Sequence, residues 1–319
     1  MSKKRNKHNI PDAYFAIRQL AGTDLDDCRI AADISPVQYF DDESQEAAII
    51  RRVAGKMQIS FRAPGLISRM WIAPSGRLWV AGRPRGEYGL FCGAPDSNGN
   101  DQLERVDLPN QTATVAGVFG TGDDDIFAWG GGYLRPALSW HWNGEQWRVV
   151  PTAERILDVH GPSSALVHAV GKAGFCARWT GSGWNAYAPP SPQAIDRVHV
   201  ADENRIFACA TGRVYVGSSD GWELRTEPAM GLDDLTVWRG QVVFVNQTCA
   251  HRLDGSRLVP LVDVGPKTAG SQIESDGDRV LVRHRLRVFD TGDFKRFRFV
   301  TDKEIGELIG AVTTGEPRR

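Results

Sequence analysis

The stretch Val118-Phe119-Gly120-Thr121-Gly122-Asp123-Asp124-Asp125-Ile126-Phe127-Ala128-Trp129-Gly130 decides the fold of this chain. It consists of an apolar anchor, a short polar turn and an unbroken apolar run. The pattern recurs about every 40 residues, with anchors at Met70, Val118, Val159, Val198, Leu235 and Ile273. One unit of this length, built from short strands, cannot bury both of its faces alone. The units must therefore stack on one another.

Each unit is expected to contain four strands. The second strand is the clearest, because a short continuous apolar run suits a strand covered on both faces. These runs span 78–81, 126–129, 166–170, 206–210, 242–245 and 280–282. Later strands follow Asn-Gly or Asp-Gly turns, which are typical of tight hairpins. The pattern predicts an all-β fold, a single closed β-propeller with seven four-stranded blades, and six blades as the alternative.

The two flanks of the repeat are expected to complete the ring. Residues 53–61 and 308–313 could supply strands, so both termini are predicted to share the closing blade. Residues 42–52 begin with acids and end with arginines, which favours a helical decoration because those charges suit the helix dipole. The basic segment 1–13 is expected to be disordered, and the propeller is expected to span 14–316.

Composition limits the classes of partner. The chain has 38 Lys and Arg against 39 Asp and Glu, a net charge of −1, which gives no global attraction to nucleic acid or to an anionic membrane. The five cysteines are odd in number and none has CxxC spacing, as expected for buried free thiols in a reducing compartment. The N-terminus lacks the apolar run of a secretory signal. These features predict a cytoplasmic protein.

The stretch 118–130, followed by Trp140-His141-Trp142-Asn143-Gly144-Glu145-Gln146-Trp147, resembles a known repeat. It is similar to the VWG-x-G-x-DDVWAVG and HWDG-x-x-W repeat of bacterial β-propeller proteins, which have the architecture of WD40 and Ycf48-like propellers. The resemblance covers about residues 66–300 and weakens away from this unit. It implies a fold and supplies no catalytic residues to transfer.

Two enlarged loops are the predicted contact surface for a partner. In a four-stranded blade, the connections between the second and third strands emerge at one end of the ring. The first two recognised units carry Arg83, Arg85 and Tyr88, and Tyr133 and Arg135, in these connections. Arginine and tyrosine on loops of a rigid scaffold are enriched at protein interfaces.

A second set of candidates lies at one repeated position. Trp71, Phe119, His160 and His199 each follow an anchor, so they are expected to form a ring near the propeller axis. Two imidazoles there could hold a metal or a proton, but no third ligand is evident. We predict no metal and no cofactor, and a core position for His168.

Two charged stretches have structural alternatives. The basic stretch 279–298 contains Arg279, Arg283, Arg285, Arg287, Lys295, Arg296 and Arg298. Arg283, Arg285 and Arg287 share one face at strand period, which indicates either a solvated blade face or a basic surface for an acidic partner. The acidic cluster 123–125 occupies a turn and lacks the ligand spacing of a calcium loop, so a structural turn is expected.

The sequence therefore predicts a non-catalytic, monomeric propeller that recognises another protein. The most specific form of this hypothesis is a cytosolic bacterial inhibitor or immunity-type protein that neutralises one toxin or enzyme. One alternative is a carbohydrate-binding propeller, in which exposed tryptophans stack on sugar rings. The other is a propeller hydrolase or lyase, which requires an Asp/Glu/His cluster near the axis.

Overall fold

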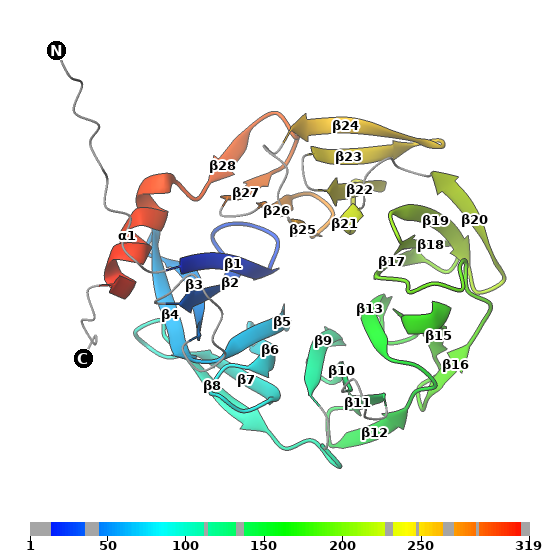
Figure 1. The fold of residues 1–319 in the computed structure, drawn as a ribbon, viewed down its shortest axis with the longest axis horizontal. Coiled ribbons are helices and arrows are strands. Elements are labelled where there is room, and N and C mark those ends of the chain that lie inside the picture. Colours follow the sequence, from blue (N-terminus) through cyan, green and yellow to red (C-terminus); the bar gives the residue numbers. More distant parts are fainter. Residues whose placement is uncertain are drawn as a thin grey trace.

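The chain forms a ring of seven blades around a central axis (Figure 1). The computed structural model describes residues 14–35, 45–111, 114–131, 137–226, 232–246, 249–263, 271–284 and 287–313. Each blade is a sheet of four consecutive antiparallel strands, the first nearest the axis and the fourth at the rim. The prediction of a seven-bladed, all-β propeller is confirmed.

The first four blades follow one another along the chain. Blade 1 contains β1 Tyr14–Ala21, β2 Arg29–Ser35, β3 Glu46–Val53 and β4 Lys56–Pro64. Blade 2 contains β5 Leu66–Ile72, β6 Leu78–Arg83, β7 Gly89–Pro95 and β8 Asp101–Val106. Blade 3 contains β9 Val115–Gly122, β10 Asp125–Gly130, β11 Leu138–Trp142 and β12 Trp147–Pro151. Blade 4 contains β13 Ile156–Ser163, β14 Leu166–Gly171, the 3-10 turn η1 Lys172–Gly174, β15 Cys176–Trp179 and β16 Trp184–Ala186.

Three further blades and one helix complete the ring. Blade 5 contains β17 Arg197–Asp202, β18 Arg205–Ala210, β19 Arg213–Ser218 and β20 Gly221–Thr226. Blade 6 contains β21 Leu232–Trp238, β22 Gln241–Asn246, β23 Cys249–Asp254 and β24 Arg257–Asp263. Blade 7 contains β25 Ser271–Ser275, β26 Val280–His284, β27 Arg287–Thr291 and β28 Phe297–Phe299, and the helix α1 Asp302–Thr313 follows it.

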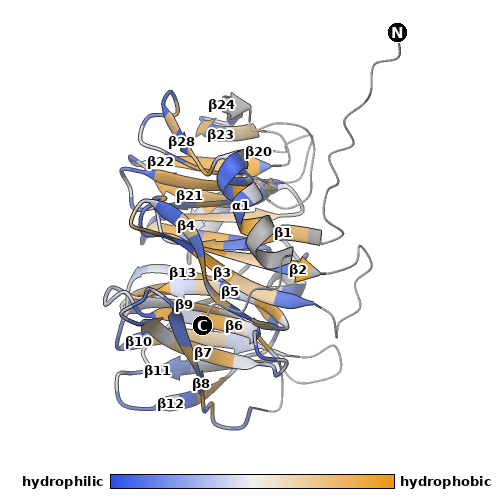
Figure 2. Cartoon of the chain, turned by 90° about the vertical axis from the view of Figure 1, so that its left-hand side faces the viewer, coloured by the Kyte–Doolittle hydropathy of each residue, from blue (hydrophilic) through white to orange (hydrophobic). Residues whose placement is uncertain are grey.

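The core lies between the blades. The predicted second strands fall within β6, β10, β14, β18, β22 and β26, and β10 and β14 are buried along their whole length. Among the described residues the apolar side chains form seven clusters, one at each junction of neighbouring blades. Figure 2 shows apolar residues along the strands and polar residues at many of the turns. Burial between blades explains why these strands have no polar face.

The antiparallel order gives the ring two distinct ends. Connections from the first to the second strand and from the third to the fourth emerge at one end, which we call the turn end. Connections from the second to the third strand, and from one blade to the next, emerge at the other, which we call the loop end.

The prediction of a helix over residues 42–52 is wrong. Residues 46–52 lie in strand β3, whose run Ala47-Ala48-Ile49-Ile50 is fully buried and pairs with β2 and β4. This run is a strand covered on both faces, like the apolar strands of the other blades. Arg51 and Arg52, which follow it, continue the same strand and do not lie at the end of a helix. Residues 42–44, and the segment 1–13 that was expected to be disordered, lie outside the described residues.

The predicted sharing of a closing blade by both termini is also wrong. Residues 53–61 belong to blade 1, which is built entirely from N-terminal strands, and residues 308–313 belong to helix α1. The helix begins after a capping box. The amide of Glu304 donates to Thr301 Oγ1 at 3.2 Å, and the amide of Thr301 donates to Glu304 Oε2 at 2.8 Å. This reciprocal pair satisfies two amides at the helix start.

Helix α1 packs over the junction at which blades 7 and 1 close the ring. It lies against the outer strand β4 of blade 1 (Figures 1 and 2). Ile305 and Leu308 are buried in the cluster that joins blades 7 and 1, and Arg52 pairs with Glu304 at 3.1 Å. No helix among the described residues is long and apolar enough to cross a membrane.

Candidate functional site

The predicted axial residues lie next to one another on successive inner strands. Trp71 on β5 is 6.3 Å from Phe119 on β9, measured between ring centroids, and Phe119 is 5.3 Å from His160 on β13. His160 stacks on His199 of β17 at 3.9 Å. The four rings form a continuous arc that covers four of the seven blades.

The stacked imidazoles are neutral. Burial, with a contribution from the charge of Arg69, lowers the pKa of His160 to about 3. Burial and the neighbouring His160 hold the pKa of His199 well below its ordinary range. The amide of Val200 donates to Nδ1 of His160 at 3.0 Å, which places the imidazole proton on Nε2. Neither nitrogen of His160 then has a free lone pair for a metal. Among the described residues, no three or more His, Cys, Asp or Glu side chains lie together in a way that could hold a metal ion.

A charged layer lies beside the arc, at the residue before each anchor. Arg69 Nη2 is 2.7 Å from Asp158 Oδ1, and Arg197 Nε donates to Asp234 Oδ1 at 3.1 Å. The Arg69–Asp158 pair spans blade 3, where the equivalent residue is Gly117. The guanidinium of Arg69 passes 5.6 Å from the ring of Trp129. Burial would lower the pKa of Arg197, but the facing carboxylates of Asp234 and Asp158 outweigh it and raise that pKa.

Three side chains at this position also connect neighbouring blades. Asp158, Asp234 and Gln272 each accept a hydrogen bond from the backbone amide of an inner strand in the next blade: from Val198 at 3.0 Å, from Ile273 at 3.1 Å and from Leu20 at 2.7 Å, respectively. The structure therefore does bring aspartates, a glutamate and histidines to the axis, as the hydrolase alternative requires. Asp158, Asp234 and His160, however, hold adjacent blades together.

Glu274 differs from the other axial acids. Burial and the nearby charge of Asp234 raise its pKa to about 7. Its Oε1 accepts a hydrogen bond from Gln272 at 3.0 Å. This carboxyl group therefore titrates near neutral pH.

The predicted contact loop of blade 2 is exposed at the loop end. Tyr88 is 42% exposed, and the guanidinium of Arg83 lies 5.6 Å from its ring centroid. Arg85 is exposed and lies 6.0 Å from the ring of Phe61. Gln111 donates to the carbonyl of Tyr88 at 3.0 Å, which fixes the loop. The other two loop candidates, Tyr133 and Arg135, lie outside the described residues.

The predicted basic face does not form. Strand β26 ends at His284 and β27 begins at Arg287, so the strand period cannot continue across this hairpin. Arg283 is buried and donates to the carbonyl of Ile17 at 3.3 Å, and burial lowers its pKa to about 10. Arg287 is exposed, and Arg285 lies outside the described residues.

Of the acidic cluster 123–125, Asp123 and Asp124 form the turn between β9 and β10, as expected, and Asp125 begins β10. Asp123 Oδ2 accepts the amide of Ser75 at 3.0 Å, which joins the turns of blades 2 and 3. Asp125 Oδ1 accepts a hydrogen bond from His141 Nε2 at 2.7 Å. His168 is buried and its Nδ1 lies 2.9 Å from the hydroxyl of Tyr187, as expected of a core histidine.

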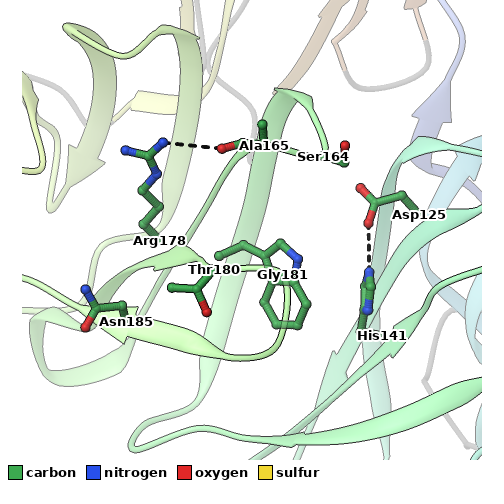
Figure 3. A pocket seen from close by; sticks show the side chains of 9 residues that line it. Asp125, His141, Ser164, Ala165, Arg178, Thr180, Gly181 and Asn185 are labelled. Atoms are coloured by element: carbon green, nitrogen blue, oxygen red, sulfur yellow. Dashed lines mark hydrogen bonds and ion pairs between the residues drawn. The ribbon is translucent and has the colours of Figure 1, made fainter.

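A cleft of about 520 Å³ opens at the turn end between blades 3 and 4. Figure 3 shows Asp125 and His141 on one side, and Arg178, Thr180 and Asn185 on the other. Arg178 donates to the carbonyl of Ala165 at 3.3 Å. Among the described residues no hydroxyl is hydrogen-bonded to His141, and the hydroxyl of Thr121 donates to the other carboxylate oxygen of Asp125. The cleft can offer hydrogen bonds to a polar ligand.

Sequence reasoning missed the charged axial layer and one arginine of a second cleft. The axial layer had a signal, because Arg69, Asp158, Arg197 and Asp234 each directly precede an anchor. The second cleft, also at the turn end, is lined by Arg239 together with Arg279, Arg296 and Arg298 of the predicted basic stretch. That stretch did not reveal Arg239, because blade 6 contributes this residue and blade 7 the other three.

Comparison with known proteins supports the fold. No family model matches the chain, and no curated protein matches its sequence. Among solved structures, the WD40 β-propeller domain of Doa1 matches with a TM-score of 0.63 and 8% identity, over 91% of this chain and 94% of that chain. YCF48 bound to a D1 peptide matches with a TM-score of 0.54 and 12% identity, over 85% and 93%. At these identities the matches show a WD40-like propeller architecture. Membership of the bacterial repeat family stays a prediction.

Proposed function

We propose that this protein is a non-catalytic recognition propeller that binds a partner protein at its loop end. The observation that carries the proposal is the exposed Tyr88 with Arg83 against its ring, on a loop fixed to a rigid scaffold. Tyrosine and arginine are enriched among the few residues that carry most of the binding energy of protein interfaces. YCF48, which shares the architecture, was solved with a peptide bound.

A photo-cross-linking experiment tests this proposal. Tyr88 is replaced by p-benzoylphenylalanine in the organism that encodes the chain, and the same replacement at Leu224 serves as control. Leu224 is 44% exposed on the outer strand of blade 5. We expect one discrete protein adduct at position 88 and none at 224. The adduct is identified by mass spectrometry, and its binding is then measured with purified proteins. No adduct at 88, or the same adduct at both positions, would contradict the proposal.

The more specific hypothesis is that the partner is a toxin or an enzyme and that binding neutralises it. It is tested on the purified partner, whose activity is assayed with and without an equimolar amount of propeller. Loss of activity with wild type, and its recovery when Arg85→Glu weakens the contact, would support this role. Full activity in the presence of saturating propeller would contradict it.

A second candidate function is recognition of a hydroxylated small ligand such as a sugar. The observation that favours it is the polar cleft between blades 3 and 4, where Arg178, Thr180 and Asn185 face Asp125 and His141. A glycan array should then reveal one family of ligands, and Asn185→Ala should abolish that binding without changing stability, because Asn185 is exposed. An array without signal would exclude this candidate.

A further inference from the structure

A basic cleft lies at the turn end between blades 6 and 7, opposite the loop that carries Tyr88. It measures about 380 Å³. Its walls are the β21–β22 turn of blade 6 and the β25–β26 and β27–β28 turns of blade 7. The amide of Arg239 donates to the carbonyl of Gly277 at 2.8 Å, and Nε1 of Trp238 donates to that of Asp278 at 2.9 Å. These bonds join the two blades and fix the width of the cleft.

Four guanidinium groups and two carboxylates line the cleft. The side chain of Asp290 is fully buried and is paired with both Arg279 and Arg298. Burial would raise the pKa of Asp290, but these arginines and the amide of Leu25 hold it below its ordinary value. The carboxylate at the floor is therefore ionised and fully engaged.

The second carboxylate is also engaged. Oδ1 of Asp293 accepts the amides of Lys295 and Arg296, each at 2.8 Å, and so closes its own turn. The carboxylate of Asp293 also attracts the nearby guanidinium of Arg296, whose charge helps to lower the pKa of Asp293, but the cleft holds four guanidinium groups against two carboxylates. The cleft therefore presents an excess of positive charge to solvent.

Arg239 and Arg296 carry that excess. Both are exposed, and within the described residues neither guanidinium makes a hydrogen bond or an ion pair. The guanidinium of Arg239 lies 5.0 Å from the ring of Trp238, which orients it. Arg239 also has a φ of +49° in a two-residue turn with Gly240. Asparagine, aspartate or glycine is the usual residue at such a position.

We propose that this cleft binds an acidic peptide segment, with one carboxylate on Arg239 and a second on Arg296. The two arginines come from different blades, so they fit two separate carboxylates of one chain. A guanidinium binds a carboxylate through two parallel hydrogen bonds. The net charge of −1 gives no general attraction to polyanions, so the contact depends on these side chains. The site is distinct from the proposed contact at Tyr88, because the two lie at opposite ends of the ring.

Fluorescence anisotropy with fluorescein-labelled hexaglutamate tests the proposal, with labelled hexaglutamine as the uncharged control. We expect saturable binding of hexaglutamate that weakens as salt is raised, because salt screens exposed charges. Arg239→Gln and Arg296→Gln should each weaken binding by roughly tenfold or more, as expected for a lost charge-assisted hydrogen bond. Neither side chain holds the fold together, so the thermal unfolding of both variants should match wild type.

Two matched controls make the result specific. Arg148→Gln removes an exposed arginine from β12 of blade 3, and Tyr88→Ala removes the proposed contact at the loop end. Neither should change the affinity for hexaglutamate. Equal weakening by Arg148→Gln would show attraction by surface charge alone and would overturn the proposal. Displacement of the peptide by millimolar inorganic phosphate, with phosphate itself bound through Arg239 and Arg296, would assign the cleft to phosphate and overturn it as well.

Discussion

Gly117→Ala should destabilise the propeller from a position that contacts no ligand. Gly117 lies on the inner strand β9, paired with Trp129 of β10. A Cβ atom added there would lie 2.2 Å from two carbons of the indole ring, whereas carbon atoms in contact sit about 3.5–4 Å apart. Trp129 is only 1% exposed and packed between blades 3 and 4. The ring must therefore move inside a packed core, which costs about 1–3 kcal/mol.

The expected fall in the melting temperature follows from the size of the chain. An entropy of unfolding of about 2.1 cal/mol/K per residue gives about 1.5 °C per kcal/mol for 319 residues, so the melting temperature should fall by about 1.5–4.5 °C. Thermal unfolding followed by circular dichroism measures this shift. The control is Gly221→Ala, because a Cβ atom at Gly221 meets nothing within 4 Å. Equal melting temperatures for the two variants would refute the reasoning.

The effect should extend to the axial ion pair, because the guanidinium of Arg69 lies against the indole of Trp129 on its way to Asp158. A double-mutant cycle of Gly117→Ala with Arg69→Met should give a coupling energy of about 0.5–3 kcal/mol. Strictly additive effects would show that the glycine and the ion pair are independent.

Three further predictions concern ring closure and the axis. Ile305→Ala should lower the free energy of unfolding by about 2–4 kcal/mol, because the side chain is buried where α1 packs on blades 7 and 1. An unchanged denaturation midpoint would show that the helix does not stabilise this junction. Asp158→Ala leaves Arg69 without its counter-ion and the amide of Val198 without its acceptor, so it should cost about 2–4 kcal/mol in chemical denaturation. A cost below about 1 kcal/mol would contradict this role. Glu274 has a pKa of about 7 in the folded chain against an ordinary 4.5, so its stabilising contribution is full below pH 4.5 and is lost as the pH rises through 7. Wild type should therefore lose stability relative to Glu274→Gln between pH 4.5 and 8, and parallel pH profiles would contradict the shifted pKa.

The repeat made the architecture predictable because every blade must bury its strands against the neighbouring blades, which requires the same pattern of apolar residues in each unit. A second strand covered on both faces needs a continuous apolar run, and each run found in the sequence is a second strand in the structure. The same rule also explains the error at residues 46–52. Ala47-Ala48-Ile49-Ile50 is a continuous run as well, but periodicity cannot distinguish a covered strand from a buried helix. The acidic residues before this run and the arginines after it then favoured a helix, which was wrong.

The axial arc was predictable for a related reason, since equivalent positions on inner strands converge. Trp71, Phe119, His160 and His199 could be placed from the anchors alone. The positions of Arg283, Arg285 and Arg287 could not be predicted in this way. A hairpin separates Arg283 from Arg287, and the alternation of side chains along one strand does not continue through a turn into the next strand. The cleft between blades 6 and 7 could not be assembled from the basic stretch alone, because Arg239 lies in a turn about 40–60 residues earlier along the chain than the other three arginines.

The use of polar side chains inside the ring determines where a ligand can bind. At the axis, Asp158, Asp234 and Gln272 accept amides from the next blade, so their acceptor oxygens serve the closure of the ring. Substituting them would lower stability as well as any binding at the axis. A loss of axial binding could then not be separated from a loss of stability. At the turn end and the loop end of the ring, by contrast, some exposed side chains can be replaced without removing a bond between blades. Arg239 and Arg296 can be replaced without removing an internal bond, and Tyr88 is held through its backbone carbonyl. These three side chains are therefore the positions at which a loss of binding reports on recognition itself.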